Sequence, residues 1–324
     1  MLCYKTKLGE AHCGDSMELI DLELEDSSID LIITSPPFAL QRQKEYGNLT
    51  GEEYVDWLCQ FMEKMMTKLK DTGSIVLDLG GAYVKGAPEF SLYQFEVLMK
   101  LCKEVGYKLC QPFYWNNTSA LPAPIEWVNK RKLRAKNSVN TIWWLSKNPS
   151  IAKANVSNVL VPYSARMKNL IQTHGKGYLK EDGIETRPSG HTHSADSWSK
   201  DNGGAIPGNI LNIPNSESNS LYLRACKAAG VKGHPARFPL AIPDFFIEML
   251  TDENDLVVDI FGGSGTTGQA AENLGRRWKT FEISHEYVAA SSFRFIQDAS
   301  EAADVYDRIM HFEMLDFSDK QLSL

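Results

Sequence analysis

The sequence lacks the long apolar runs and the paired cysteines that mark several large classes of protein. No apolar stretch in its 324 residues approaches the roughly 20 needed to cross a bilayer, and residues 1–5 lack the apolar core of a signal peptide. The six cysteines, at positions 3, 13, 59, 102, 110 and 226, show no C-x-x-C spacing, so neither a disulfide framework nor a zinc site is indicated. We expect reduced thiols inside a cell, no membrane partner and no bound metal.

A net positive charge is also absent. The chain carries 34 basic and 41 acidic residues, a net charge of −7, which argues against a nucleic-acid partner. The acidic residues are concentrated towards the two ends, and basic residues cluster between them. The basic cluster comprises Lys130, Arg131, Lys132, Arg134 and Lys136, and Arg187 lies further along the chain. From charge alone, a solvated surface and a phosphate-binding cleft are equally good interpretations.

Buried strands and amphipathic helices alternate along the chain. Short apolar segments predict strands, expected to run parallel, at residues 29–34, 74–79, 139–144, 256–261 and 278–283. A capping box of Thr50 and Glu53 predicts the start of a helix that runs to about Leu69. Further helices are expected at residues 243–250 and 284–295. The alternation predicts an α/β fold with a mostly parallel, doubly wound sheet.

The stretch from about Pro149 to Lys232 differs from the rest of the chain. It is rich in Ser, Asn, Gly and His, and long irregular segments inside a compact protein are usually functional or disordered. We therefore expect an inserted, loop-rich module between two halves of one α/β domain. The predicted boundaries are residues 1–150 for the first half, 151–230 for the insertion and 231–324 for the second half.

A glycine-rich loop follows the strand at residues 256–261. Residues 262–268 read Gly-Gly-Ser-Gly-Thr-Thr-Gly and lead into a helix, an arrangement that brings backbone N–H groups close to an anion. Glu282 ends the next strand, about 20 residues on, where a carboxylate can accept both hydroxyls of a ribose. The motif predicts a nucleotide-like cofactor, either S-adenosylmethionine or a nicotinamide or flavin; a purely structural turn is a weaker interpretation.

Ser35, Pro36, Pro37 and Phe38 follow the strand at residues 29–34. Two consecutive prolines lack the N–H donors that a central strand needs, so they stiffen a loop at the strand's carboxyl end, where α/β enzymes place their sites. Taken alone, the four residues are best explained as a rigid turn with a core phenylalanine. The preceding strand and the glycine loop elsewhere in the chain favour a site instead.

Methyl transfer to a conjugated amine explains this choice of residues. The lone pair on N4 of cytosine is delocalised into the ring, so the amine is a poor nucleophile. Hydrogen bonds from its two N–H groups to Ser35 Oγ and the Pro36 carbonyl would draw the nitrogen towards tetrahedral geometry. Catalysis would then rest on positioning and electrostatics rather than on a strong base. Phe38 would stack on a base that has been flipped out of the helix.

The sequence resembles the beta group of amino-methyltransferases of restriction–modification systems, and within it the PvuII-type DNA cytosine-N4 methyltransferases. The matching segments include residues 34–42, 45–48, 124–132, 199–204 and 234–239, and the similarity covers nearly the whole chain. The group is circularly permuted, with the catalytic loop ahead of the cofactor loop, which is the order seen here. The resemblance implies a permuted S-adenosylmethionine-dependent methyltransferase fold in which the loop-rich insertion is the target-recognition region.

The resemblance also assigns roles to individual residues, and without it Asp15 is no more than an N-cap or turn aspartate. Catalysis is assigned to Ser35, Pro36, Pro37 and Phe38. Cofactor binding is assigned to Asp15, Asp259, Phe261, Gly262, Gly263, Ser264, Gly265, Thr266, Thr267, Glu282, Phe238 and Pro239. DNA contact is assigned to Lys130, Arg131, Lys132, Arg134, Arg187 and Lys200.

The implied activity is site-specific methylation of cytosine N4 in a flipped-out base, with S-adenosylmethionine as methyl donor and double-stranded DNA as partner. A cognate restriction endonuclease is expected as a genetic partner only. We expect a monomer in the cytoplasm, associated with the nucleoid, or in the nucleus for a copy transferred to a eukaryote.

Three alternatives stay open. DNA adenine-N6 methylation uses the same amine chemistry, and Ser35 in place of Asp or Asn leans towards cytosine without deciding the matter. Glutamine and RNA methyltransferases usually place Asn-Pro-Pro-Tyr after the glycine loop, which is the opposite order. A DNA-binding module with a decayed cofactor site would not need Ser35, Asp15 and Glu282 intact. His191 and His193 lack a third ligand, so they are interpreted as DNA contacts or bystanders.

Overall fold

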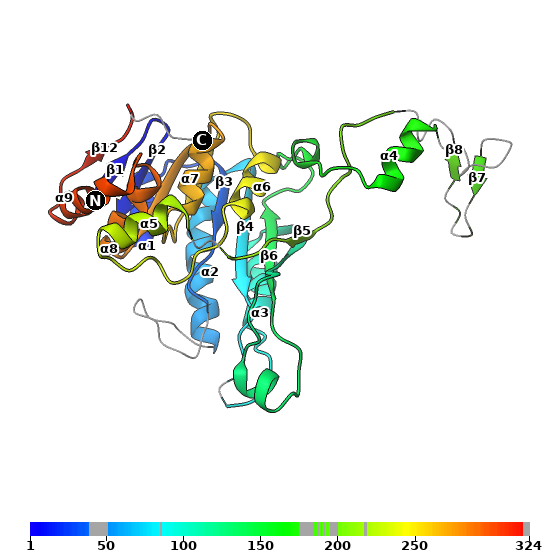
Figure 1. The fold of residues 1–324 in the computed structure, drawn as a ribbon, viewed down its shortest axis with the longest axis horizontal. Coiled ribbons are helices and arrows are strands. Elements are labelled where there is room, and N and C mark those ends of the chain that lie inside the picture. Colours follow the sequence, from blue (N-terminus) through cyan, green and yellow to red (C-terminus); the bar gives the residue numbers. More distant parts are fainter. Residues whose placement is uncertain are drawn as a thin grey trace. The chain divides into compact units, whose positions relative to one another are not determined.

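The structure of the protein, a computed structural model, describes residues 1–38, 51–84, 86–174, 184–186, 188, 190, 192–194, 200–216 and 219–319. These residues form two compact units (Figure 1). The larger unit contains residues 1–154 and 209–324, and the smaller one contains residues 155–208. The chain therefore leaves the larger unit once and returns to it.

A ten-stranded sheet runs through the described part of the larger unit, in the order β12-β1-β2-β11-β10-β3-β4-β6-β5-β9. Its strands are β1 (Leu2–Lys5), β2 (Gly9–Cys13), β3 (Ile29–Thr34), β4 (Leu69–Gly80), β5 (Lys108–Asn116), β6 (Val139–Ser146), β9 (Ile210–Asn212), β10 (Leu256–Asp259), β11 (Arg277–Glu282) and β12 (Leu315–Asp316). Five neighbouring strands, from β2 to β4 in the sheet order, are parallel. Every residue of β3 and β10 is buried, as expected for parallel strands covered on both faces.

The direction of β6 corrects one expectation. The apolar pattern of residues 139–144 predicts a parallel strand, but β6 pairs antiparallel with both β4 and β5. A strand that is covered on both faces is apolar throughout, whichever way it runs. The pattern therefore predicts that the segment is a buried strand and carries no information about its direction.

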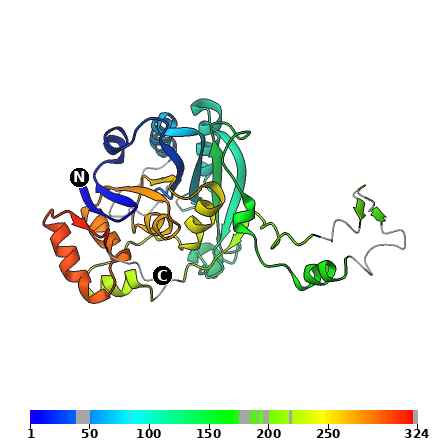
Figure 2. The same cartoon turned by 90° about the horizontal axis from the view of Figure 1, so that it is seen from above.

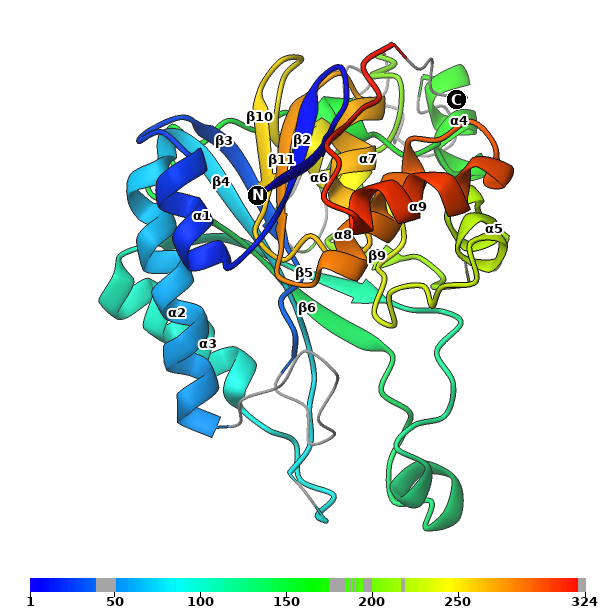
Figure 3. The same cartoon turned by 90° about the vertical axis from the view of Figure 1, so that its left-hand side faces the viewer.

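Helices cover both faces of this sheet (Figures 2 and 3). One face carries α1 (Ser16–Glu23), α2 (Gly51–Lys68) and α3 (Tyr93–Lys100), and the other carries α5 (Leu221–Ala228), α6 (Ala241–Leu250), α7 (Thr266–Asn273), α8 (His285–Ser291) and α9 (Ala302–Met310). The helices predicted at residues 243–250 and 284–295 are confirmed as α6 and α8, the latter continuing into a 3-10 turn at Ser292–Arg294. Among the described residues, no helix is long and apolar enough to cross a membrane.

The centre of the sheet contains a topological switch point between β3 and β10. From β3 the chain crosses through α2 to β4 on one side, and from β10 it crosses through α7 to β11 on the other. The loops after β3 and β10 therefore leave the sheet in opposite directions, which opens a crevice at the carboxyl ends of the strands. The Ser-Pro-Pro-Phe loop and the glycine loop are the two loops at this point.

The smaller unit has little regular structure in its described residues. It contains α4 (Ala165–Gln172) and a hairpin of β7 (Ile184–Thr186) and β8 (Thr192–Ser194). Val161 and Ala205 form a bridge in which each backbone N–H donates to the other's carbonyl. The predicted insertion at residues 151–230 is wider than this unit, because β9 and α5 belong to the larger one. Thr50, Arg187 and His191, and the side chain of His193, lie outside what the structure describes.

Candidate active site

A cavity of about 440 Å³ lies at the carboxyl edge of the sheet, beside the switch point. Four segments far apart in the sequence line it. They contribute Asp15, Ser16 and Met17; Ser35, Pro36, Pro37 and Phe38; His234 and Ala236; and Ile260, Phe261, Glu282 and Ile283, while α2 adds Trp57, Gln60 and Phe61. The catalytic loop and the two carboxylates predicted from the sequence are thus brought into one cavity.

Ser35 is paired with a buried aspartate that the sequence analysis did not select. The Ser35 hydroxyl donates to Asp78 Oδ2 over 3.1 Å, and Asn140 Nδ2 donates to Asp78 Oδ1 over 3.2 Å. Asp78 lies near the end of β4, next to β3, and is 5% exposed. Burial raises the pKa of Asp78 to about 7, although the two hydrogen bonds act in the opposite direction. The site therefore contains a carboxyl group that titrates near neutral pH.

Asp259 joins the two loops at the switch point. Its carboxylate accepts hydrogen bonds from Thr34 Oγ1 and Thr267 Oγ1, both at 2.7 Å, and from the backbone N–H of Phe261 at 3.0 Å. Asp259 is 1% exposed and does not line the cavity, and burial raises its pKa. Thr34 immediately precedes Ser35, so Asp259 fixes the catalytic loop and the glycine loop relative to each other rather than facing a ligand.

The glycine loop needs glycine at positions where the backbone turns and approaches other groups. Gly263 and Gly265 have φ values of +49° and +71°, which L side chains rarely adopt. Behind the loop, the buried Arg294 donates to the Ser264 carbonyl and, over 2.9 Å, to Thr266 Oγ1. Arg294 therefore braces the loop from the side away from the cavity.

Two carboxylates face the cavity from neighbouring strand ends. Glu282 accepts the backbone N–H groups of Gly263 and Ser284, each at 2.9 Å, and burial raises its pKa. Asp15 is the N-cap of α1 and accepts the N–H of Met17 at 2.8 Å. The Gly14 N–H donates to the Glu282 carbonyl over 3.0 Å, which ties the two acidic residues together.

An apolar wall stands beside these carboxylates. The ring of Phe261 lies 5.5 Å from that of Trp57 and 5.1 Å from that of Phe61, and Ile283 on the cavity wall is 65% exposed. Carboxylates that can accept hydroxyl groups, next to an apolar slot and a glycine loop, match the ribose and the planar base of a nucleoside. The residues present therefore fit an adenosyl cofactor.

Phe38 is held against the backbone of β4. A Cβ at Gly80 would lie 2.3 Å from the Phe38 ring, so only glycine lets the ring lie flat against this strand end. Phe38 also lines the cavity. The ring is therefore fixed in place before any ligand binds.

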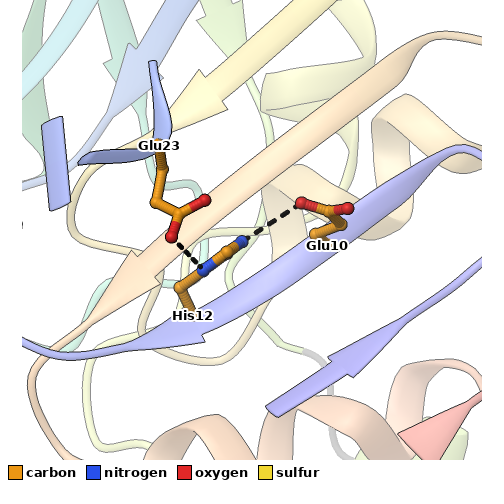
Figure 4. A group of neighbouring side chains, drawn as sticks. All are labelled: Glu10, His12 and Glu23. Carbon is orange, nitrogen blue, oxygen red and sulfur yellow. Dashed lines mark hydrogen bonds and ion pairs between the residues drawn. The ribbon is translucent and has the colours of Figure 1, made fainter. Parts of the chain in front are cut away.

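A cluster of charged side chains lies behind the site on β2, α1 and β11 (Figure 4). His12, 2% exposed, has Nε2 3.2 Å from Glu10 Oε2 and Nδ1 3.5 Å from Glu23 Oε1. Lys279 Nζ lies 3.3 Å from the same Glu10 oxygen. Since the protein itself supplies a cation to these carboxylates, we interpret the group as an ion-pair cluster that ties α1 to the sheet.

The structure separates the remaining predicted residues into groups. Gly262, Gly263, Ser264, Gly265, Thr266 and Thr267 form the loop and helix start next to the cavity without lining it, and Phe238 and Pro239 precede α6 and are likewise not among its lining residues. Lys130, Arg131, Lys132 and Lys200 are exposed. Arg134 is half-buried: it donates to the Pro88 carbonyl, and its guanidinium lies 3.9 Å from the centre of the Tyr83 ring.

The sequence analysis missed Asp78 and the helix residues Trp57 and Phe61. Asp78 lies inside a segment correctly predicted as a strand, and a carboxylate in the buried strand Ile75–Gly80 is itself an unusual feature that could have marked it. Trp57 and Phe61 are four residues apart on α2, a spacing that the sequence shows but that is equally typical of a core-facing helix.

The permuted sheet and the cavity at its switch point define an S-adenosylmethionine-dependent methyltransferase fold. The sequence model of the DNA methylase family matches residues 29–293, and the chain belongs to this family. The resemblance noted from the sequence is thereby confirmed.

Individual relatives agree with this assignment. The chain is 54% identical over 318 residues to the type II methyltransferase M.PvuII of Proteus hauseri, covering 97% of this chain and 93% of the relative. It is 26% identical to M.BglII of Bacillus subtilis, covering 88% and 68% of the two chains. The solved structure of the cytosine-N4-specific PvuII DNA methyltransferase matches with a TM-score of 0.79 at 46% identity over 98% of both chains.

A more distant solved structure shares the fold. It is that of TTHA0409 from Thermus thermophilus, a putative DNA modification methylase complexed with S-adenosyl-L-methionine. It matches with a TM-score of 0.51 at 17% identity and covers 96% of this chain and 98% of that one.

Proposed function

We propose that the protein is a site-specific DNA methyltransferase that transfers the methyl group of S-adenosylmethionine to the N4 amine of a cytosine. The observation that carries the proposal is that Ser35 and Glu282 line one cavity. The 54% identity to M.PvuII, over nearly the full length of both chains, supports the choice of cytosine N4 in DNA.

Ser35 and Pro36 would act on the target amine. The Ser35 hydroxyl oxygen and the Pro36 carbonyl accept its two N–H groups, which localises the lone pair on nitrogen. The two prolines hold these acceptors in a stiff loop, so that little reorganisation is needed when the base arrives.

Asp78 would orient the Ser35 hydroxyl. A hydroxyl has one proton and two lone pairs, and the hydrogen bond to Asp78 uses the proton. The lone pairs of Ser35 Oγ are then available to the substrate amine. This arrangement requires Asp78 to be ionised, because a protonated Asp78 can itself donate to Ser35 and occupy one of these lone pairs.

Phe38 would hold the flipped base. Its ring is packed on Gly80 and lines the cavity, so it offers a fixed aromatic surface on which a cytosine can stack. A target base reaches this surface only outside the duplex, so base flipping is part of the proposal.

Glu282, Asp15 and Phe261 would hold the cofactor. We assign Glu282 to the ribose hydroxyls, Asp15 to the adenine amine and Phe261 to the adenine ring. When bound, S-adenosylmethionine supplies an electrophilic methyl group on a sulfonium and leaves as S-adenosylhomocysteine. Asp259, Arg294 and the glycine loop hold these groups in register.

Double-stranded DNA would contact two parts of the chain. Lys130, Arg131 and Lys132 are exposed cations on the larger unit and are assigned to phosphates. The smaller unit, with Lys200, is assigned to recognition of the target sequence, together with Arg187. Replacing the first three cations by alanine should reduce the salt dependence of DNA binding by roughly three counterions.

The relatives named type II methyltransferases suggest the cellular setting. We propose a monomer that acts on DNA in the cytoplasm, at the nucleoid, with a restriction endonuclease as its genetic partner. A copy transferred to a eukaryote would act in the nucleus.

The decisive experiment is incubation of the purified protein with duplex DNA and labelled S-adenosylmethionine, followed by nucleoside mass spectrometry and mapping of the modified positions. N4-methylcytosine at one recurring sequence is the expected result. N6-methyladenine would replace cytosine by adenine as the substrate. DNA binding without any methylated nucleoside would instead identify a binding module whose catalytic site has decayed.

A further inference from the structure

The connection between β5 and β6, residues 117–137, forms an arm that projects beyond the sheet (Figures 1 and 3). Internal hydrogen bonds hold it in shape. The Asn117 N–H donates to the Ser138 carbonyl over 2.7 Å, and Lys136 Nζ donates to the Ala120 carbonyl over 2.8 Å. A short helical turn at Glu126–Lys130 lies within it. The arm is thus a defined element of the larger unit.

One side of the arm's base is joined to the catalytic loop. Phe38 packs on Gly80, and a Cβ on the next residue, Gly81, would lie 3.2 Å from Asn137 Nδ2 at the base of the arm. Arg134 spans from the arm to the carbonyl of Pro88 in the loop that follows Gly81. A short series of packed residues therefore leads from the catalytic phenylalanine to the arm.

The other side of the base is joined to the cavity wall. The Asn215 N–H lies 3.0 Å from both Asn117 Oδ1 and Ser119 Oγ, and Asn215 Nδ2 donates to the Arg237 carbonyl over 3.0 Å. Ala236, next to Arg237, lines the cavity. The arm is thereby fixed to two walls of the cavity and stands on the same edge of the sheet.

The arm combines exposed apolar side chains with concentrated positive charge. Leu121 is 80% exposed, and Ile125 and Leu133 are each 61% exposed. Its charged residues are Lys130, Arg131, Lys132, Arg134 and Lys136 with a single acidic residue, Glu126, on a chain whose net charge is −7. Apolar side chains flanked by cations are the combination used by proteins that insert a wedge between base pairs while holding the phosphates.

We propose that the Leu121–Ile125 segment enters the DNA duplex beside the target base and occupies the space that the flipped cytosine leaves. The neighbouring cations, Lys130 to Lys132, bind the backbone phosphates and press the segment into the stack. The inference rests on the proposed function, because a wedge is useful only to an enzyme that extrudes its target. It assigns a role in flipping to residues outside the cavity.

The test compares two substrates once the methylated position has been mapped with the wild-type protein. One is a duplex with the target cytosine paired to guanine, and the other carries a mismatched base opposite the same cytosine, which lowers the cost of flipping. A Leu121→Ala, Ile125→Ala double variant should lose on the order of tenfold in kcat/KM on the paired duplex. On the mismatched duplex its kcat/KM should come within about threefold of the wild type.

Leu22→Ala is the matched control, since Leu22 is 76% exposed on α1, away from the arm. It should behave as the wild type on both duplexes. The Kd for S-adenosylmethionine and the thermal midpoint of the double variant should also be unchanged, which reports an intact fold.

Two results would overturn the wedge. They are an unchanged rate of the double variant on the paired duplex, and an equal loss on both duplexes. Failure of the proposed function is a separate outcome, in which the wild-type protein itself methylates no cytosine in either duplex.

Discussion

The hydroxyl of Ser35 donates a hydrogen bond to the buried carboxylate of Asp78 across neighbouring strand ends. The pair separates two tasks. Ser35 faces the cavity, whereas Asp78 is buried behind it and sets the direction of the serine proton. Substitution of either residue should therefore change catalysis without changing the way the cofactor is held.

Ser35→Ala should lower kcat by roughly tenfold or more, because one acceptor for the target amine is lost. The Kd for S-adenosylmethionine, measured by calorimetry, should stay the same. Ser28→Ala is a suitable control, since Ser28 immediately precedes the opposite end of β3. Near-normal turnover by Ser35→Ala would remove Ser35 from the mechanism.

The rate of methylation should rise with pH through about 7. Burial raises the pKa of Asp78 to about 7, and only the ionised carboxylate leaves the lone pairs of Ser35 free for the amine. Asp78→Asn should lose this step in the single-turnover pH profile and have a lower, flatter rate. A wild-type profile with no inflection between about pH 6 and 8 would contradict the role of Asp78.

Glu282→Gln should raise the Kd for S-adenosylmethionine by roughly tenfold or more, because a charged acceptor for the ribose hydroxyls is replaced by a neutral one. Glu286→Gln provides the same chemical change at an exposed position on α8 and should leave the Kd unchanged. If both variants bind the cofactor as the wild type does, Glu282 is not a ligand.

Gly9→Ala should destabilise the protein by about 1–3 kcal/mol through overpacking. A Cβ at Gly9 would lie 2.2 Å from an atom of the Trp278 ring. That ring is 1% exposed and stacked on Phe295 at 5.3 Å, so it has no room to retreat. The urea midpoint measures the effect, and Gly208→Ala, where a Cβ would meet nothing within 4 Å, is the control.

The free energy of unfolding should fall as the pH drops below about 6.5, and His12 should account for part of the loss. Burial lowers the pKa of His12 from its ordinary value of 6.5, so below that pH the unfolded chain takes up a proton more readily than the folded one. Glu10 and Glu23 favour the proton on His12, whereas Lys279 opposes it.

His12→Gln should reduce the slope of stability against pH between about 7 and 5, measured by urea unfolding at each pH. The exposed His311, replaced in the same way, serves as the control. Equal slopes in the wild type and His12→Gln would show that His12 is not the group responsible.

The sequence predicted the central strands and the two loops of the site because each leaves a local pattern. Residues 29–34 and 256–261 are apolar runs followed by proline or glycine, and this pattern is independent of the rest of the fold. Asp78 was missed because its importance lies in a neighbour 43 residues away, Ser35. A cross-strand hydrogen bond leaves no local trace in a sequence.

The direction of β6 and the role of Asp259 were beyond reach for the same reason. The pairing of β6 depends on the course of the chain between strands, and Asp259 acts through Thr34, 225 residues earlier. In contrast, Glu282 could be found because its distance from the glycine loop follows from the length of one helix and one strand.

The bridge between Val161 and Ala205 has a consequence for the way such enzymes diversify. It closes the smaller unit close to both points where the chain enters and leaves it, so the segment begins and ends at nearly the same place. Recombination between related genes can exchange a segment of this kind as a cassette while the sheet and its cavity are inherited unchanged. New target sequences would then arise by transfer of one stretch of gene, with no remodelling of the catalytic machinery.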